Sequence, residues 1–163
     1  MSGGRPLPLR LRFLAGGAGG LLLLALPLLS VLRLAPVRGA SMEPTLQAGQ
    51  WLFYEALPAW LLDARRGDLV VFRSPMSPGH HYVKRVVGLA GDELRFEASR
   101  LLVNGLPQRL PEGAVPDGLT LSTRVPQGHF YAIGDHGSVS YDSRRFGAVA
   151  CTQLIGRVLW PLP

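Results

Sequence analysis

The sequence is poor in cysteine, and Cys151 is its only thiol. A single thiol cannot form a disulfide within the chain, so the fold neither requires nor excludes an oxidising compartment. The HExxH pattern of zinc peptidases is also missing, and the adjacent His80 and His81 lack the spacing that would let them converge on one ion with Cys151 or His136. We therefore predict no metal and no other cofactor.

Lysine is almost absent as well, because Lys84 is the only lysine among the 17 lysine and arginine residues. A guanidinium keeps its proton in any protein environment, whereas a buried ammonium can lose it. Period-two alternation places Lys84 on one strand face with Tyr82 and Val86. If that face is buried, desolvation can lower a lysine pKa by about 3 to 5 units. Lys84 is therefore a candidate general base; the alternative is a lysine left by chance on a solvated strand.

Basic residues form no run of five or six and no stripe, although the formal net charge is +6. Proteins that bind nucleic acid usually gather such residues on one face or along one helix. We therefore expect no nucleic-acid partner. An anionic lipid bilayer is the partner that this scattered charge favours.

Charge is missing altogether from the 20 residues between Arg12 and Arg33. A helix of that length spans about 30 Å, the thickness of a hydrocarbon core. We predict a basic N-terminal segment at 1–12, one transmembrane anchor at 13–34 and a folded domain at 35–163. A cleaved secretory signal is the alternative, but Arg38 fits the small-residue cleavage pattern poorly and the apolar run is longer than usual.

Helical periodicity is absent beyond residue 40. Short runs rich in β-branched and aromatic residues alternate with Gly, Pro and Asp, which is typical of strands. Asn104-Gly105 predicts a hairpin turn, and residues 104–128 read as a loop-dominated connection. The sequence thus predicts an all-β domain whose strands begin near residues 51, 68, 82, 93, 100, 129 and 154.

A general base needs a nucleophile, and the best candidate is Ser41 in the stretch GASMEPTL at 39–46. Pro44 fixes its own φ and restricts the residue before it, so the backbone there is stiff. A serine hydroxyl is a weak nucleophile until a base takes its proton, and Ser-Lys pairs are an established way of doing so. An ordinary turn that leaves a membrane helix is the alternative interpretation.

The order of four motifs resembles the bacterial type I signal peptidases: SMEPTL at 41–46, RRGDLVVF at 65–72, YVKRVVGLAGDEL at 82–94 and GDHGSVSYDSRRFG at 134–147. The resemblance implies a signal-peptidase/LexA-like β-fold behind one membrane helix. It also implies a serine endopeptidase that removes signal peptides from exported preproteins after small residues. The implied location is the bacterial cell membrane, with the N-terminus cytoplasmic and the catalytic domain outside.

The resemblance also assigns roles to single residues. Ser41 matches the nucleophile and Lys84 the general base, while Ser140 matches a serine that hydrogen-bonds the lysine amine. Asp142 and Arg144 match a structural acid and base, and the backbone N–H of Ser41 would supply one oxyanion donor.

The sequence departs from the family pattern in two places. Gly39 stands where some members have a serine that supplies a second oxyanion donor, so a backbone group or water replaces it or the oxyanion hole is weaker. The chain has GDHGSVS where the family usually has GDNRDNS, so we expect the loop that holds Ser140 to be shaped differently.

Several alternatives stay open. A Ser-His-Asp triad with His136 and Asp142 would leave Lys84 unexplained, and no GxSxG pattern is present. A LexA-like self-cleaving regulator would need a DNA-binding helical module, and the sequence contains none. A conjugation-type peptidase with one dedicated substrate and an inactive membrane-anchored binding homologue also fit the sequence. The apolar residues of segment 55–68 would either pack in the core or rest among lipid headgroups.

Overall fold

A computed structural model describes residues 31–59, 61–62 and 64–161. Most of the expected anchor, residues 13–30, lies outside these ranges. No helix within the described ranges is long and apolar enough to span a membrane. One folded unit begins at Arg33, close to the predicted start of the domain.

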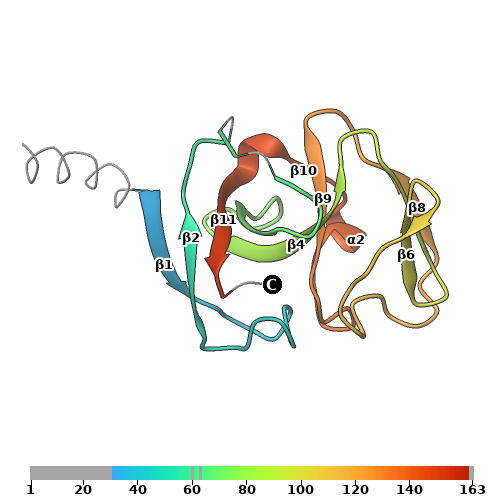
Figure 1. Cartoon of the computed structure of the whole chain (residues 1–163), viewed down its shortest axis with the longest axis horizontal. Helices are drawn as coiled ribbons and strands as arrows, with labels where there is room; N and C mark the ends of the chain where they lie inside the picture. The colour runs from blue at the N-terminus through green and yellow to red at the C-terminus, as the bar shows by residue number, and fades with distance from the viewer. Residues whose placement is uncertain (1–30, 60, 63, 162–163) are drawn as a thin grey trace, which may run out of the picture. The chain divides into compact units, whose positions relative to one another are not determined.

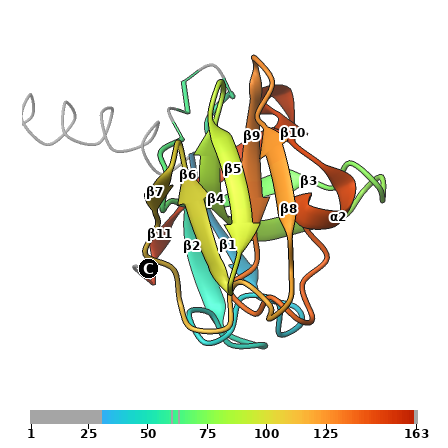
Figure 2. The same ribbon diagram turned by 90° about the vertical axis from the view of Figure 1, so that its right-hand side faces the viewer.

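Two β-sheets make up this unit (Figure 1). The larger has the strand order β1-β2-β11-β3-β4-β9-β10, and the smaller has the order β7-β6-β5-β8. Figure 2 shows the smaller sheet facing the viewer. The large-sheet strands are β1 (Leu32–Pro36), β2 (Trp51–Glu55), β3 (Leu69–Arg73), β4 (His81–Leu89), β9 (His129–Ile133), β10 (Val149–Ala150) and β11 (Leu154–Trp160). The small-sheet strands are β5 (Glu93–Glu97), β6 (Arg100–Val103), β7 (Leu106–Pro107) and β8 (Leu121–Arg124).

All seven predicted strands are confirmed, and so is the predicted hairpin. Asn104 and Gly105 have φ values of 54° and 81°. Two positive φ values in succession are what a two-residue type I′ turn requires, and this turn joins β6 to β7.

Strand β4 is the central element for the site, because it pairs with β3 on one side and with β9 on the other. Val70 lies opposite Lys84, and Ile133 lies opposite Arg85. The β4 residues from Lys84 to Gly88 are all buried, so both faces of this strand are covered. A charged side chain on either face therefore needs a partner or a role.

Three clusters of buried apolar side chains form the core, and two of them support the site. One lies beneath the segment after β1 and contains Val37, Met42, Leu46, Leu52, Leu69, Val71 and Val158. Another joins the two sheets through Val87, Leu94, Phe96, Leu101, Val103, Val115, Val125, Tyr131 and Ile133.

The structure differs from the sequence prediction in short elements. A four-residue helix α2 (Ser143–Phe146) follows Asp142, which caps it, although no helix was expected beyond residue 40. The 104–128 connection contains β7 and β8. Strand β1 begins at Leu32, so residues 32–34, predicted as the end of the anchor, are extended here. A four-residue helix and strands of two residues are too short for a sequence period to reveal, whereas β1 and β8 lie in segments that the sequence pattern assigned to the anchor and to a loop.

Candidate active site

The turn after β1 places Ser41 at the surface of the domain while fixing the residues on either side of it. Met42 and Leu46 are fully buried in the core, and Leu46 N–H donates to the carbonyl of Met42 at 2.9 Å. The backbone N–H of His136 donates to the carbonyl of Ser41 at 3.1 Å. Ser41 is therefore held by the core on one side and by the loop after β9 on the other.

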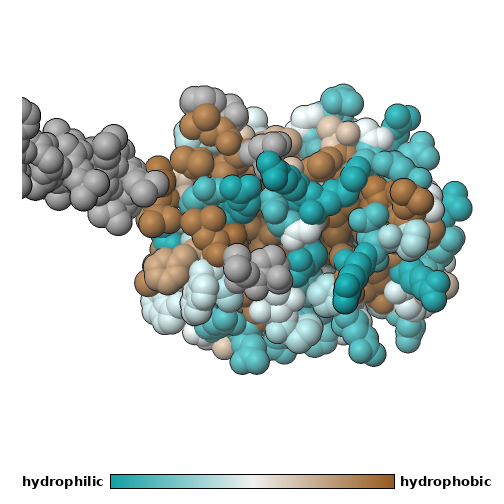
Figure 3. Space-filling model, in the orientation of Figure 1, coloured by the Kyte–Doolittle hydropathy of each residue, from teal (hydrophilic) through white to brown (hydrophobic). Residues whose placement is uncertain are grey.

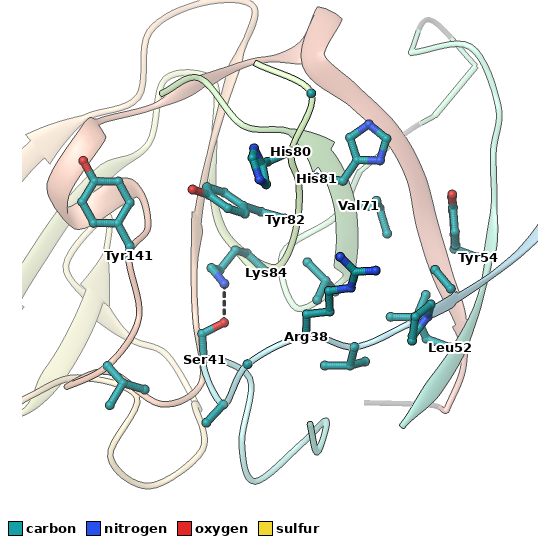
Figure 4. Close-up of a pocket in the computed structure, with 18 residues that line it drawn as sticks. Arg38, Ser41, Leu52, Tyr54, Val71, His80, His81, Tyr82, Lys84 and Tyr141 are labelled. Atoms are coloured by element: carbon teal, nitrogen blue, oxygen red, sulfur yellow. Dashed lines mark hydrogen bonds between the residues drawn. The ribbon is translucent and has the colours of Figure 1, made fainter. Parts of the chain in front are cut away.

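Lys84 is buried on β4, with 4% of its surface exposed, and its Nζ lies 2.6 Å from Oγ of Ser41. Figure 4 shows the two side chains pointing toward each other across the pocket. The ring centroid of Tyr82 lies 5.6 Å from the same nitrogen. The structure therefore brings together the two residues that the sequence singled out.

Burial lowers the pKa of Lys84 from 10.5 to about 8, because the ammonium form loses its hydration. The charges of Asp142 and Asp135 oppose this shift, and the charge of Arg144 adds to it. With a pKa near 8, roughly a tenth of the side chain is neutral at pH 7. The amine can therefore accept a proton near neutral pH.

A pocket of about 580 Å³ opens beside this pair (Figure 4). Its lining joins the segment before Ser41 to residues of β2, β3 and β4, and Val139 and Tyr141 complete it. Apolar side chains form much of the wall. They include Val37, Leu52, Tyr54, Val71 and Val83.

Asp142 and Arg144 support the site without reaching Ser41. The fully buried Asp142 accepts hydrogen bonds from Gly134 N–H at 2.8 Å and from Arg144 Nε at 2.9 Å. Arg144 in turn donates to the carbonyl of Ala114 at 2.5 Å. This pair ties both ends of the 134–142 loop to the connection from the smaller sheet, a structural contact that fits the role implied by the resemblance.

The loop sequence GDHGSVS has a steric explanation at Gly137. A Cβ at this position would lie 2.5 Å from the carbonyl oxygen of Ala114 and 2.6 Å from that of Gly113. Gly137 N–H donates to Gly113 at 2.9 Å, so the two loops meet backbone to backbone. The larger residue expected from the family pattern does not fit here without a shift of one loop.

The hydrogen bond expected between Ser140 and the lysine amine is not present. Oγ of Ser140 is buried but has no hydrogen-bond partner among the described residues, and the same is true of Nδ1 of His136. Ser140 Oγ instead packs against Gly134, where an added Cβ would lie 2.2 Å from it. The Nδ1 atom of His136 has no partner among the described residues, and Asp142 is bound by Arg144. These two residues therefore do not form the His-Asp part of a Ser-His-Asp triad.

Gly39 has a φ of 79°, a left-handed conformation that suits glycine. No atom lies within 4 Å of a Cβ built there, so backbone conformation and not crowding favours glycine. The N–H of Ser41 forms no hydrogen bond within the described ranges and lies beside the pocket, where it is available as a donor.

A buried ion pair next to the site was not predicted from the sequence. Arg85 Nε and Nη2 donate to the two oxygens of Asp135 at 2.9 and 2.8 Å. Arg85 also donates to the carbonyl of Gly67 at 2.9 Å and to the hydroxyl of Thr45 at 3.4 Å. The sequence feature that could have revealed this pair was Arg85, a charged residue next to Lys84 on the opposite face of a buried strand.

A comparison with known protein families identifies the family of this chain. A family model described as signal peptidase, peptidase S26, matches residues 12–162. The chain belongs to this family.

Three related signal peptidases illustrate the similarity. The chain is 36% identical to signal peptidase I of Bacillus caldolyticus over 143 residues, covering 77% of this chain and 78% of that protein. It is 35% identical to a probable signal peptidase I-2 of Synechocystis over 138 residues, 78% of this chain and 62% of that protein. Signal peptidase IB of Staphylococcus aureus is 30% identical over 147 residues, with coverage of 77% and 76%.

A solved structure supports the same β-fold. The crystal structure of a signal peptidase I from Enterococcus faecalis matches with a TM-score of 0.53 at 24% identity. The match covers 59% of this chain and 97% of the solved chain.

Proposed function

We propose that this chain is a membrane-anchored serine endopeptidase that removes signal peptides from exported preproteins. Ser41 is the nucleophile and Lys84 the general base. The observation that carries the proposal is the distance of 2.6 Å between Ser41 Oγ and a buried lysine amine, in a chain of the signal peptidase family.

Acylation begins when the neutral amine of Lys84 takes the hydroxyl proton of Ser41 as Oγ attacks the scissile carbonyl carbon. The new C–O bond leaves a negative charge on the carbonyl oxygen, to which the N–H of Ser41 donates a hydrogen bond. Collapse of this intermediate breaks the C–N bond. The ammonium of Lys84 gives its proton to the departing amine, and an ester on Ser41 remains.

Deacylation repeats these steps with water as the nucleophile. Lys84 takes a proton from the water as it attacks the ester carbon, and the proton then passes to Oγ of Ser41. The products are the signal peptide with a free carboxylate and the restored hydroxyl. The same amine therefore serves as base and acid in both halves of the reaction.

Selection of small side chains next to the scissile bond follows from the apolar wall beside Ser41. An extended substrate points alternate side chains to the same side. The first and third residues before the scissile bond would face the apolar side chains of Val37, Val71 and Val83.

A precursor-processing assay tests the proposal directly. The full-length chain, purified in neutral detergent, is incubated with an exported precursor, and the new N-terminus of the product is sequenced. A single cut after a small residue at the end of the signal peptide supports the proposal. Cleavage of only one dedicated precursor would favour a conjugation-type peptidase. If no precursor is cleaved, the chain is better explained as an inactive membrane-anchored binding homologue.

The rate should depend on pH through Lys84. Its pKa of about 8 lies below the ordinary 10.5, so the active neutral form is lost as pH falls below 8. We expect kcat/KM to rise about tenfold per pH unit between roughly pH 6 and 7.5 and to level off above 8. Cleavage rates of a peptide substrate across this range measure the profile. A plateau that already exists at pH 6, or a midpoint near 10, would contradict the role of a desolvated amine.

We also propose that one face of the domain rests on the bilayer. Exposed apolar side chains gather on β1, β2 and β11, next to the start of the described chain, and Figure 3 shows apolar atoms over this side. The Phe53 and Trp160 rings lie 6.1 Å apart, edge to face. Tryptophan favours the membrane interface. The exposed residues are Leu32, Leu34, Trp51, Phe53, Leu159 and Trp160.

Segment 55–68 is divided between the core and the surface. Ala59, Leu62 and Ala64 pack against a buried cluster, whereas Leu61 is 52% exposed. The predicted packing of this segment in the core is therefore confirmed for Ala59, Leu62 and Ala64. Among the described residues of the segment, contact with lipid is a proposal for Leu61.

If the apolar face formed by β1, β2 and β11 rests on the bilayer, lipid should quench the fluorescence of Trp160. In full-length protein with Trp51→Phe and Trp60→Phe, reconstituted into vesicles, phospholipids brominated on their acyl chains should quench the remaining Trp160 fluorescence. The matched control adds Trp160→Phe and Leu106→Trp, because Leu106 is 68% exposed on the smaller sheet. Equal quenching at both positions would show that this face has no special contact with lipid.

A further inference from the structure

The mouth of the active-site pocket carries basic side chains and no acidic ones. Arg38, His80 and His81 line it together with Lys84, and none of the 18 lining residues is Asp or Glu. Arg38, His80 and His81 are exposed, and we call these three residues the basic rim. Figure 4 shows Arg38 extending toward the side of the pocket on which His81 lies.

Arg38 differs from three other arginines of the described chain in its ion pairing. Arg66, Arg85 and Arg144 each form an ion pair with an aspartate. Arg38, in contrast, forms no ion pair with any residue in the described part of the chain. An exposed guanidinium beside a substrate pocket, with no acidic group on the wall, is available to a carboxylate that arrives with the substrate.

The rim lies close in sequence to the two proposed reacting residues. Arg38 precedes Ser41 by three residues, and His81 precedes Lys84 by three residues on β4, which is about 10 Å along that extended strand. Residues 36–40 lead from β1 to Ser41. Under the proposed function, the signal peptide also comes from the bilayer, so its last residues run beside this segment.

Alternation then decides which substrate residues meet the rim. In an extended chain, the first and third residues before the scissile bond face the apolar wall, so the second and fourth face the pocket mouth. We propose that the basic rim selects preproteins with an acidic side chain at the second or fourth residue before the scissile bond. This inference rests on the proposed function and adds a substrate preference to it.

Paired peptide substrates test the preference. Two peptides differ only by Glu or Gln at the second residue before the scissile bond, a second pair differs at the fourth, and the full-length protein is assayed in neutral detergent. We expect kcat/KM to favour Glu by about two- to fivefold in at least one pair, because an exposed pair of opposite charges contributes a factor of a few. At 1 M salt the ratio should approach one, since the Debye length falls to about 3 Å.

Variants then assign the preference to the rim. Arg38→Gln should bring the Glu/Gln ratio close to one, and His81→Gln should reduce it in part. Arg95→Gln removes the same charge from an exposed position on β5 and should keep the wild-type ratio. Because each ratio is taken within one variant, a general loss of activity does not affect it.

The outcomes separate the two proposals. Cleavage of all peptides with Glu/Gln ratios near one overturns the preference and leaves the proposed function standing. A ratio that Arg38→Gln does not change also overturns it. If the peptides behave alike but Arg38→Gln abolishes stimulation by phosphatidylglycerol vesicles, the rim binds lipid and the preference is wrong. If no peptide and no precursor is cleaved, the proposed function and the preference fall together.

Discussion

Replacing Lys84 by arginine should abolish cleavage, although the new side chain is also basic. A guanidinium does not release its proton in a protein, so it cannot take the proton of Ser41. We expect kcat to fall by about 10³-fold or more, and Ser41→Ala should have a similar effect. The double variant should be no worse than either single variant, because the two residues act as one unit. Cleavage of a precursor by the three purified proteins measures this.

A stability measurement separates this explanation from misfolding. The folded pKa of Lys84, about 8, lies below its unfolded value of 10.5, so between these pH values the unfolded chain binds more protons. Wild-type stability therefore rises with pH through this window, and below pH 8 the folded state carries a buried charge at a cost. Lys84→Met removes that cost, so the inactive variant should be more stable at pH 7 by up to about 3 kcal/mol.

Thermal or urea unfolding of both proteins at pH 7 and pH 10 gives the comparison. The stability advantage of Lys84→Met should shrink at pH 10. If the variant is instead less stable at pH 7, the ammonium is well solvated or paired in the folded state. Substantial cleavage by Lys84→Arg would independently contradict the neutral-amine mechanism.

Local sequence patterns predicted the strands because each has at least four residues of β-type composition between turn residues. They did not predict α2, β7 and β10, which have two to four residues each, nor β1 and β8, which lie in segments assigned to the anchor and to a loop. For such elements the tertiary contacts decide the conformation. Asp142 illustrates this, since its side chain caps α2 and accepts from Gly134 eight residues earlier.

The sequence predicted the two proposed reacting residues of the site but not the contacts that support them. Lys84 stood out as the single lysine on an alternating strand, and Ser41 by its motif. Their separation of 43 residues along the chain is closed by the strand order β1-β2-β11-β3-β4 of the larger sheet, which a one-dimensional pattern does not show. The missing hydrogen bond of Ser140 depends on the path of the 134–142 loop, which Gly137 allows to lie against another loop.

The Arg85–Asp135 pair should be the most sensitive support of this site. Asp135 is fully buried and Arg85 is 9% exposed, so removing one partner leaves an uncompensated buried charge. We expect Asp135→Asn to lower the free energy of unfolding by about 3 kcal/mol or more. Cleavage should fall as well, because Asp135 begins the loop that reaches Ser140 and Arg85 contacts Thr45 in the Ser41 turn.

A more exposed ion pair is the matched control. Arg157 Nη2 lies 2.6 Å from Glu55 Oε1, with side chains 35% and 18% exposed, so Glu55→Gln should cost less than about 1 kcal/mol. The double variant Arg85→Met with Asp135→Leu should recover much of the stability, because apolar side chains replace both buried charges. It should not recover cleavage, since the bonds to Gly67 and Thr45 are also gone. If Asp135→Asn unfolds no more readily than Glu55→Gln, the buried pair does not hold the site together, and the position of Ser41 depends on the apolar anchors Met42 and Leu46 instead.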